Sequence, residues 1–214
     1  MKASKAMVML LLIGSLFYTS SMATAQQHET KFFNYGYGHI GGILSPHGWG
    51  SISFDNVNDD LDLTSKFAGG IHLSGYWILN RNLHLGAYFN YVKGTGEIEK
   101  IGTTDVEHFG VGASVKAGGM VSDRIWLGIV GDFGYYALSV DKTNDTYDGF
   151  EISPRLHMDV SAFGAGEFKM GFFASVGPSF VPYIKGAIGA FGFNSDFKAW
   201  LITLQLRFGL TFGA

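Results

Sequence analysis

The sequence of 214 residues has no cysteine, only four prolines and, after its first 25 residues, no long apolar run. Without thiols it can form neither disulfides nor thiolate metal or redox centres. The most apolar later stretch, 170–193, is interrupted by Pro178, Pro182 and Lys185, whereas a membrane-spanning helix needs about 20 apolar residues. If the later chain crosses a membrane, it therefore crosses as strands.

The chain also lacks a basic excess. It has 15 lysine and arginine residues against 18 aspartate and glutamate residues, a formal net charge of −3, which argues against nucleic acid as a partner. Glycine is abundant, with 31 residues, and aromatic residues make up 15%. So many aromatic side chains are not typical of a disordered chain.

The first 25 residues predict a secretory signal peptide. Two lysines precede an apolar stretch at about 6–18, and the small residues Ala-Thr-Ala follow at 23–25. This order of basic, apolar and small residues is that of a cleaved export signal, and the apolar stretch is too short for a spanning helix. We therefore divide the chain into a signal peptide, 1–25, and a single domain, 26–214.

The domain shows period-2 alternation, which predicts β-strands with two different faces. In 150–162, for example, one face carries Ile152, Leu156 and Val160, whereas the other carries mostly charged and polar residues. Eight segments show the pattern, at about 32–44, 64–79, 83–98, 106–121, 125–140, 150–163, 170–181 and 199–213.

The two faces favour a membrane protein. The apolar face is nearly free of charge for about ten residues per segment, which matches the length of a tilted strand that crosses a bilayer. The other face mixes glycine, serine, histidine and charged residues, a poor core for a soluble barrel. Apolar residues outside and polar residues inside are typical of a transmembrane β-barrel. A soluble periplasmic ligand-binding barrel is the alternative, because it also alternates.

The connections follow the same scheme. Short links alternate with longer polar ones, as they do between the periplasmic and external ends of outer-membrane barrels. The short links lie at 80–82, 122–124 and 164–169, and the longer ones at 45–63, 99–105, 141–149 and 182–198.

The last strand shows the pattern most clearly. From Trp200 to Phe212 every second residue is large and apolar, whereas Arg207 lies on the other face. The domain resembles the small eight-stranded outer-membrane barrels of the OmpA/OmpX type. Its last strand resembles the C-terminal assembly signal of that class, although Gly213 and Ala214 follow the final aromatic residue.

This resemblance implies an all-β fold, an up-and-down, eight-stranded antiparallel transmembrane β-barrel in the outer membrane. It also implies a monomer in contact with outer-membrane lipids, lipopolysaccharide and the assembly machinery.

Inward-facing side chains predict a polar network in the lumen. An eight-stranded barrel is just wide enough for its own side chains, so three cations and three carboxylates there must pair or stay hydrated. The network comprises Lys116, Asp132, Glu151, Arg155, His157, Asp159 and Arg207, with His72, His84 and His108 on the same faces. We interpret it as a structural plug. A narrow conduit for protons or small solutes is the alternative.

Aromatic residues on the apolar face predict anchors at the membrane interface. These are Trp77, Trp200, Phe208 and Phe212. Trp126 falls on the inward face, which a local bulge would explain. The acidic stretch 55–65 lacks the glycine and terminal glutamate of a calcium loop. It predicts a solvated external loop, with loose contact to divalent cations at the lipopolysaccharide surface as the alternative.

One motif favours an enzyme. His72 and Ser74 share a strand face, in weak resemblance to the His-x-Ser element of outer-membrane lipid A deacylases. Residues two apart on a strand stand about 7 Å apart, too far for a direct hydrogen bond without help, and both face the lumen. We therefore predict a non-enzymatic protein without metal or cofactor, with a structural, surface-interaction or narrow solute-passage role. A lipid-modifying hydrolase is the alternative.

Overall fold

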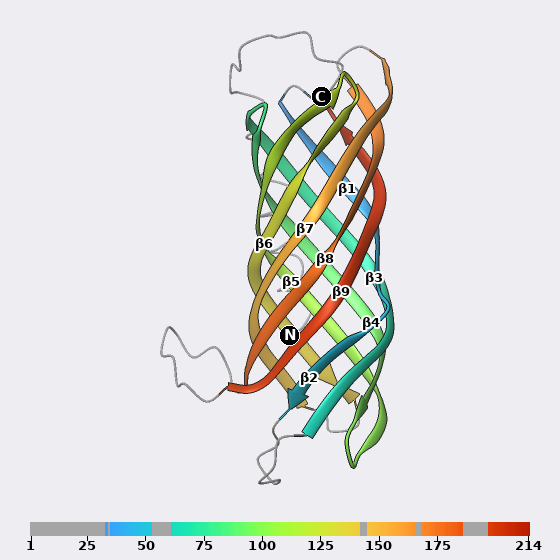
Figure 1. Ribbon diagram of the computed structural model, residues 1–214, viewed down its shortest axis with the longest axis vertical. Helices are drawn as coiled ribbons and strands as arrows, with labels where there is room; N and C mark the ends of the chain where they lie inside the picture. The colour runs from blue at the N-terminus through green and yellow to red at the C-terminus, as the bar shows by residue number, and fades with distance from the viewer. Residues whose placement is uncertain (1–32, 34, 53–60, 142–144, 166–167, 186–196) are drawn as a thin grey trace, which may run out of the picture.

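The computed structural model describes residues 33, 35–52, 61–141, 145–165, 168–185 and 197–214 (Figure 1). The predicted signal peptide lies outside these residues. Nine strands are β1 (Gly36–Ser45), β2 (Gly48–Ile52), β3 (Leu61–Asn80), β4 (Leu83–Ile98), β5 (Gly102–Ser122), β6 (Ile125–Val140), β7 (Asp145–Ala165), β8 (Phe168–Lys185) and β9 (Phe197–Gly213). Within the described ranges, no helix is long and apolar enough to span a bilayer.

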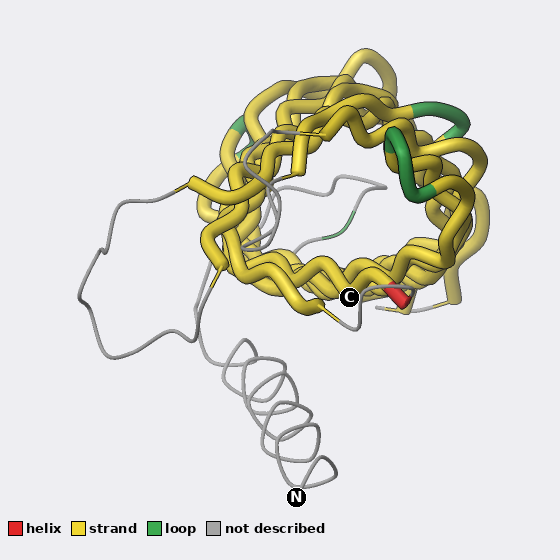
Figure 2. Tube along the Cα trace, turned by 90° about the horizontal axis from the view of Figure 1, so that it is seen from below, coloured by secondary structure: helices red, strands yellow, loops and turns green. Residues whose placement is uncertain are grey.

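The strands form one closed antiparallel barrel, seen along its axis in Figure 2. Neighbours along the chain pair with each other from β3 to β9, and β1 closes the ring by pairing with both β3 and β9. The short β2 pairs with the same two strands. It therefore continues β1 after a break at 46–47, and the nine strands fill eight positions in the wall. The predicted fold class is confirmed.

Several strands are longer than the sequence predicts. The predicted link 99–105 is mostly strand, because β5 begins at Gly102, and β7 begins at Asp145 inside the predicted link 141–149. The link 45–63 contains β2 and the start of β3, and 182–198 contains the end of β8 and the start of β9. The acidic stretch is divided: 53–60 lies outside the described residues, and 61–65 belongs to β3.

The two ends of the barrel differ. We call the end with the two-residue turns 81–82 and 123–124 the turn end, and the C-terminus lies there too (Figure 1). The opposite end, where β4 is linked to β5 through 99–101, is the loop end.

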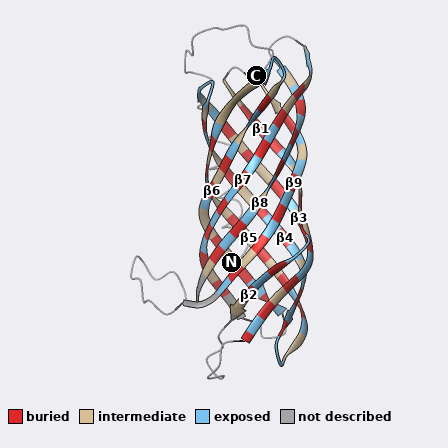
Figure 3. Ribbon diagram, in the orientation of Figure 1, coloured by how far each residue is buried: buried red, intermediate tan, exposed pale blue. Residues whose placement is uncertain are grey.

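Buried and exposed residues alternate along the strands over most of the barrel (Figure 3). Arg155 is 3% exposed, whereas its neighbour Leu156 is 66% exposed. On β9, Leu204, Leu206 and Phe208 are exposed to the surroundings. This apolar outer belt is the surface expected to face lipid acyl chains.

The polarity of the two faces reverses at the loop end of three strands. On β3, β4 and β5 the outward residues there are largely polar, and Asp62, Glu97 and Asp105 are exposed. On β2, β8 and β9 the outward face stays apolar, with Trp49, Phe180 and Trp200 exposed. The inward residues form a buried apolar group at the loop end, which is at the bottom of Figure 1. We call it the upper core, because the loop end is the proposed external end. Its members are Leu61, Leu63, Ile98, Val106, Tyr136, Leu138, Val140, Tyr147, Val181 and Leu201. On β3, β4 and β5 this end of the barrel thus has apolar residues inside and polar residues outside, as a soluble protein does, and this part of the wall is expected to stand outside the lipid belt.

Two exposed ion pairs mark the border between the belt and this polar region. Lys66 Nζ lies 2.8 Å from Glu97 Oε2, and Lys93 Nζ lies 2.8 Å from Glu107 Oε1. The hydrogen bond and the charge of Lys66 hold the pKa of the Glu97 carboxyl below its usual value. Charged groups of this kind are costly within the hydrocarbon core, so we take the Lys93–Glu107 pair as the limit of the belt on β4 and β5.

Candidate functional site in the barrel lumen

All the residues predicted for the lumen network are buried inside the barrel. They come from four strands: Lys116 from β5, Asp132 from β6, Glu151, Arg155, His157 and Asp159 from β7, and Arg207 from β9. The structure brings them together in two clusters, stacked along the barrel axis.

The central cluster is built around Asp132. Its Oδ2 atom accepts hydrogen bonds from Arg155 Nη2 at 2.6 Å and from Arg207 Nη1 at 2.7 Å. Ser114 Oγ donates to the other carboxylate oxygen at 2.6 Å. Arg207 Nη2 also lies 3.5 Å from Glu151 Oε1. Two guanidinium groups thus share two carboxylates in a space without bulk water.

Neutral polar residues complete this cluster, and the sequence did not single them out. Gln205 Oε1 accepts from Arg207 Nη2 at 2.7 Å, and Ser179 Oγ donates to Glu151 Oε1 at 2.8 Å. The amide group of Asn90 lies 2.7 Å from His72 Nδ1. All three lie on the inward face of their strands, so the alternation alone could have placed them in the lumen.

The second cluster lies nearer the turn end and is built around Lys116. Its ammonium contacts Asp159 and lies 2.9 Å from His157 Nε2. It also stands 4.8 Å from the ring centroids of Tyr37, Tyr76 and Trp126. Aromatic faces at this distance attract a cation.

Trp126 belongs to the aromatic group that fills the lumen at the turn end. It is fully buried and clusters with Phe33, Tyr37 and Tyr76, and its Nε1 donates to the Arg81 carbonyl oxygen at 3.3 Å. A local irregularity does lie beside Trp126, as the sequence suggests: the register of β5 against β6 shifts between Met120, which pairs with Trp126, and Ser122, which pairs with Ile125. The pairing of Trp126 with β7 is regular. The ring points inward because it packs against Lys116 and closes the lumen.

The structure corrects the expected separation of His72 and Ser74. His72 Nε2 lies 3.1 Å from Ser74 Oγ, because the imidazole ring extends along the strand toward the serine. Ser74 Oγ also lies 3.2 Å from His39 Nδ1, and His39 Nε2 lies 2.8 Å from Asp159 Oδ1. Serine, histidine and acid thus follow one another in the order that serine hydrolases use.

Among the described residues, the wall of the barrel buries Ser74, His39 and Asp159. Ser74 is 6%, His39 2% and Asp159 0% exposed. Between the central cluster and the upper core, the described residues enclose a void of about 10 Å³, about the space of one water molecule. A hydrolase needs an accessible nucleophile, and these three residues lie inside the wall.

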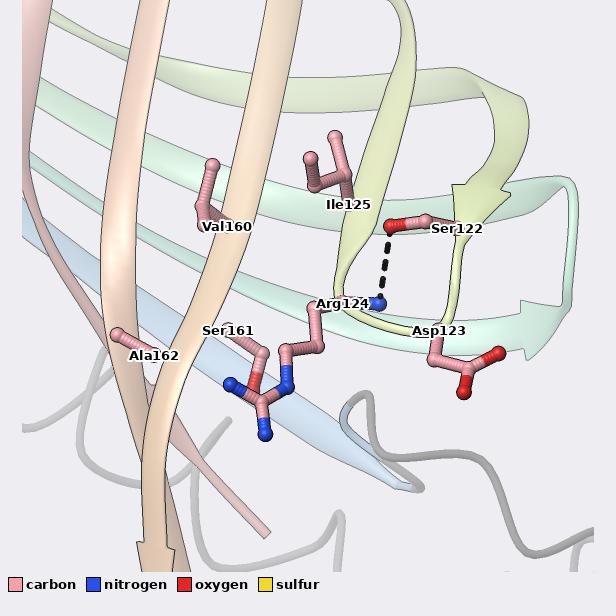
Figure 4. Close-up of a pocket in the computed structure, with 7 residues that line it drawn as sticks. All are labelled: Ser122, Asp123, Arg124, Ile125, Val160, Ser161 and Ala162. Atoms are coloured by element: carbon pink, nitrogen blue, oxygen red, sulfur yellow. Dashed lines mark hydrogen bonds between the residues drawn. The ribbon is translucent and has the colours of Figure 1, made fainter.

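A larger hollow lies outside the lumen. It has a volume of about 590 Å³ beside the turn 123–124 and is open to the surroundings (Figure 4). Its lining includes Arg124 and Asp123, which carry opposite charges. It also includes Ser161, whose backbone N–H donates to the Arg124 carbonyl oxygen at 2.8 Å. This hollow is separate from the lumen network.

The four predicted interface aromatics lie on the outer face. Trp77 is near the turn end of β3 and 46% exposed, and Trp200 is near the loop end of β9 and 40% exposed. Phe212 is half-buried at the turn end of β9. Phe208 lies four residues further into the strand and pairs with Gly42 and Ala174. Contact of these side chains with a lipid interface stays a prediction.

Comparison with known proteins identifies the architecture. No family model and no curated protein sequence matches this chain. Among solved structures, the outer membrane protein OprG from Pseudomonas aeruginosa matches with a TM-score of 0.56 and 10% identity, over 87% of this chain and 100% of that chain. Neisserial surface protein A matches with a TM-score of 0.50 and 12% identity, over 82% and 95% of the two chains.

These likenesses show the fold, which is that of the small outer-membrane β-barrel proteins. The outer membrane protease OmpT from Escherichia coli also matches, with a TM-score of 0.38 and 8% identity over 88% of this chain and 99% of that chain. A similarity this distant does not bear on activity.

Proposed function

We propose that this protein is a closed, non-enzymatic barrel of the outer membrane that serves as a structural and surface-contact protein. The observation that carries this proposal is the filling of the lumen by three groups in series. The aromatic group fills the turn end, the two charged clusters fill the middle, and the upper core fills the loop end. A permeating ion would have to displace paired charges and then cross an apolar region, and both steps are unfavourable.

The outer face supports the membrane assignment. Exposed large apolar residues cover most strands, and several, such as Phe67, Ile129 and Leu156, are more than half exposed. Such a surface is unstable in water but suits acyl chains. The charged side chains of Lys66, Glu97, Lys93 and Glu107 on β3, β4 and β5 would then meet lipid headgroups or lipopolysaccharide. The C-terminal strand remains the proposed contact for the assembly machinery, and a monomer remains the proposed state.

Conductance in a planar bilayer tests the closed lumen. We expect the folded parent protein to show no stable open level, because the void of about 10 Å³ between the central cluster and the upper core is too small for a water column. A large, long-lived conductance in the parent would make the protein a pore and would reject the proposal.

The resistance of the fold to detergent separates this proposal from a soluble periplasmic barrel. Each strand pairs with two neighbours, so we expect unboiled protein to migrate differently from boiled protein on a denaturing gel. Circular dichroism should show strand without helix. Ready extraction from membranes by carbonate would favour the soluble alternative.

A hydrolase is the second candidate, because hydrogen bonds link Ser74 to His39 and His39 to Asp159. We expect the folded protein to resist labelling by a fluorophosphonate probe, because Ser74 is buried in the lumen. Labelling of the parent that disappears in Ser74→Ala would establish an activated serine and reject the non-enzymatic assignment. Heat-unfolded parent serves as the control for reactivity that does not depend on the fold.

Processing of the N-terminus remains a proposal as well. Cleavage after the Ala-Thr-Ala pattern at 23–25 would give a mature chain that begins at Gln26. The mass of the N-terminal peptide of the membrane-extracted protein checks this, and an intact Met1 would contradict it.

A further inference from the structure

Three potential metal-binding groups meet in the cluster around Lys116. One side-chain atom from each of His39, His157 and Asp159 lies within 4.8 Å of the other two. His39 comes from β1 and the other two from β7, so the wall of the barrel holds them close together. All three are buried.

The donor set suits a particular class of ion. Two imidazole nitrogens and one carboxylate oxygen favour borderline transition metals, such as Zn²⁺, over the hard ions Ca²⁺ and Mg²⁺. Zinc ligands at about 2.0–2.2 Å from the ion stand roughly 3.4 Å from one another in a tetrahedral site. Small side-chain rotations would bring these three groups to that separation.

Hydrogen bonds around the cluster already orient its ligands. His39 Nδ1 lies 3.2 Å from Ser74 Oγ, which leaves Nε2 directed at Asp159, 2.8 Å away. Thr211 Oγ1 donates to the Asp159 carboxylate at 3.4 Å. A hydrogen bond on the second ring nitrogen is the usual way in which proteins fix the orientation of a metal-binding histidine.

A positive charge already stands between these groups. The Lys116 ammonium contacts Asp159 and lies 2.9 Å from His157 Nε2. It thus uses two of the three groups that a metal ion would need. A divalent ion and an ammonium cannot share this space, because their charges repel strongly in a site without bulk water.

We propose that His39, His157 and Asp159 form a binding site for a divalent transition-metal ion of the Zn²⁺ class, and that the Lys116 ammonium competes for the same place. The sequence predicted no metal site, because His39 and the two residues on β7 are separated by more than a hundred positions. The proposal does not depend on whether the lumen conducts.

The test compares neutral substitutions of Lys116 with the parent. The mature full-length chain is refolded in detergent with Zn²⁺ or Co²⁺, desalted, and analysed for bound metal by mass spectrometry. We expect Lys116→Met to retain about one ion per barrel and to bind at least tenfold more tightly than the parent. Bound Co²⁺ should show the intense visible absorption of a tetrahedral site.

Two further variants assign the ligands. Adding His39→Ala or His157→Phe to Lys116→Met should weaken metal binding at least tenfold. Adding His108→Ala should leave it unchanged, because His108 is also a buried histidine but lies outside the three-residue group. The gel shift on heating confirms that each variant is folded.

Three results would overturn the proposal. The first is that Lys116→Met retains no metal, and the second is that the parent retains as much metal as Lys116→Met. The third is that adding His108→Ala weakens metal binding as much as adding His39→Ala or His157→Phe. If Lys116→Met does not fold, Lys116→Gln replaces it. If neither folds, the parent decides: Zn²⁺ must raise its unfolding temperature, and His39→Ala must abolish that rise.

Discussion

Replacing Arg207 with alanine is expected to lower the free energy of unfolding by about 3–5 kcal/mol, the usual effect of breaking a buried ion pair from one side. Arg207 is 1% exposed, and its guanidinium bonds Asp132, Glu151 and Gln205. Without it, Arg155 alone must balance two carboxylates in the central cluster. Thermal unfolding in detergent, followed by circular dichroism, measures the loss.

Lys93→Ala is the matched control for this prediction. It also removes one member of an ion pair, but the side chains of Lys93 and Glu107 are 53% and 43% exposed, and water can solvate the remaining carboxylate. The control should melt close to the parent. A similar decrease in the free energy of unfolding in both variants would show that burial does not determine how much the ion pairs of the central cluster stabilise the fold.

The same Arg207→Ala protein should also conduct differently. The vacated space next to Asp132 and Glu151 admits water and leaves a net negative charge, so we expect brief cation-selective openings in planar bilayers. The upper core still lies in series with this space, so the openings should stay small. Openings as large in Lys93→Ala would show that the lumen cluster is not the barrier.

The largest effect on the upper core is expected for Leu138→Ala. Leu138 is fully buried and lies where the outer face is polar, so its deletion leaves a cavity in a water-surrounded core. Buried leucine-to-alanine changes typically cost about 2–5 kcal/mol. Leu156→Ala is the control, because Leu156 is 66% exposed on the lipid belt, where detergent or lipid can fill the space.

Conductance distinguishes the barriers in series. Leu138→Ala alone should remain closed, because the charged clusters are intact. The double variant Arg207→Ala/Leu138→Ala should conduct more than the sum of its two single variants. Open channels in Leu138→Ala alone would identify the upper core as the main barrier.

The alternation of the sequence predicts the middle of the barrel well, for a simple physical reason. A strand between lipid and lumen must alternate strictly, and 150–162 does so without interruption. The prediction is wrong at the loop end because the alternation continues there with the opposite polarity. In 61–65, Leu61 and Leu63 point inward, and Asp62 and Thr64 point outward. A search for strands with apolar outward residues interprets such a stretch as a polar loop, because its outward residues are polar.

The lumen contacts are harder to predict than the lumen residues. Which arginine meets which carboxylate depends on how far neighbouring strands are staggered, and a single sequence does not state this stagger. The sequence does not assign His39 to the lumen, because the glycines at 36, 38, 41 and 42 weaken the difference between the two faces of its strand. The close approach of His72 and Ser74 depends on a side-chain torsion, which strand spacing alone does not give.

The change of polarity at the loop end also determines how far the connections at that end stand from the lipid belt. On β4 and β5, about five residues continue beyond the Lys93–Glu107 ion pair toward the loop end, from Lys93 to Ile98 and from Glu107 to Gly102. With the rise and tilt of barrel strands, this corresponds to roughly 12 Å. The buried side chains of the upper core pack together inside this extension and hold its strands in place. If the loop end faces outward, as we propose, a molecule that approaches the cell meets the connections of β4 and β5 about this far beyond the lipid belt.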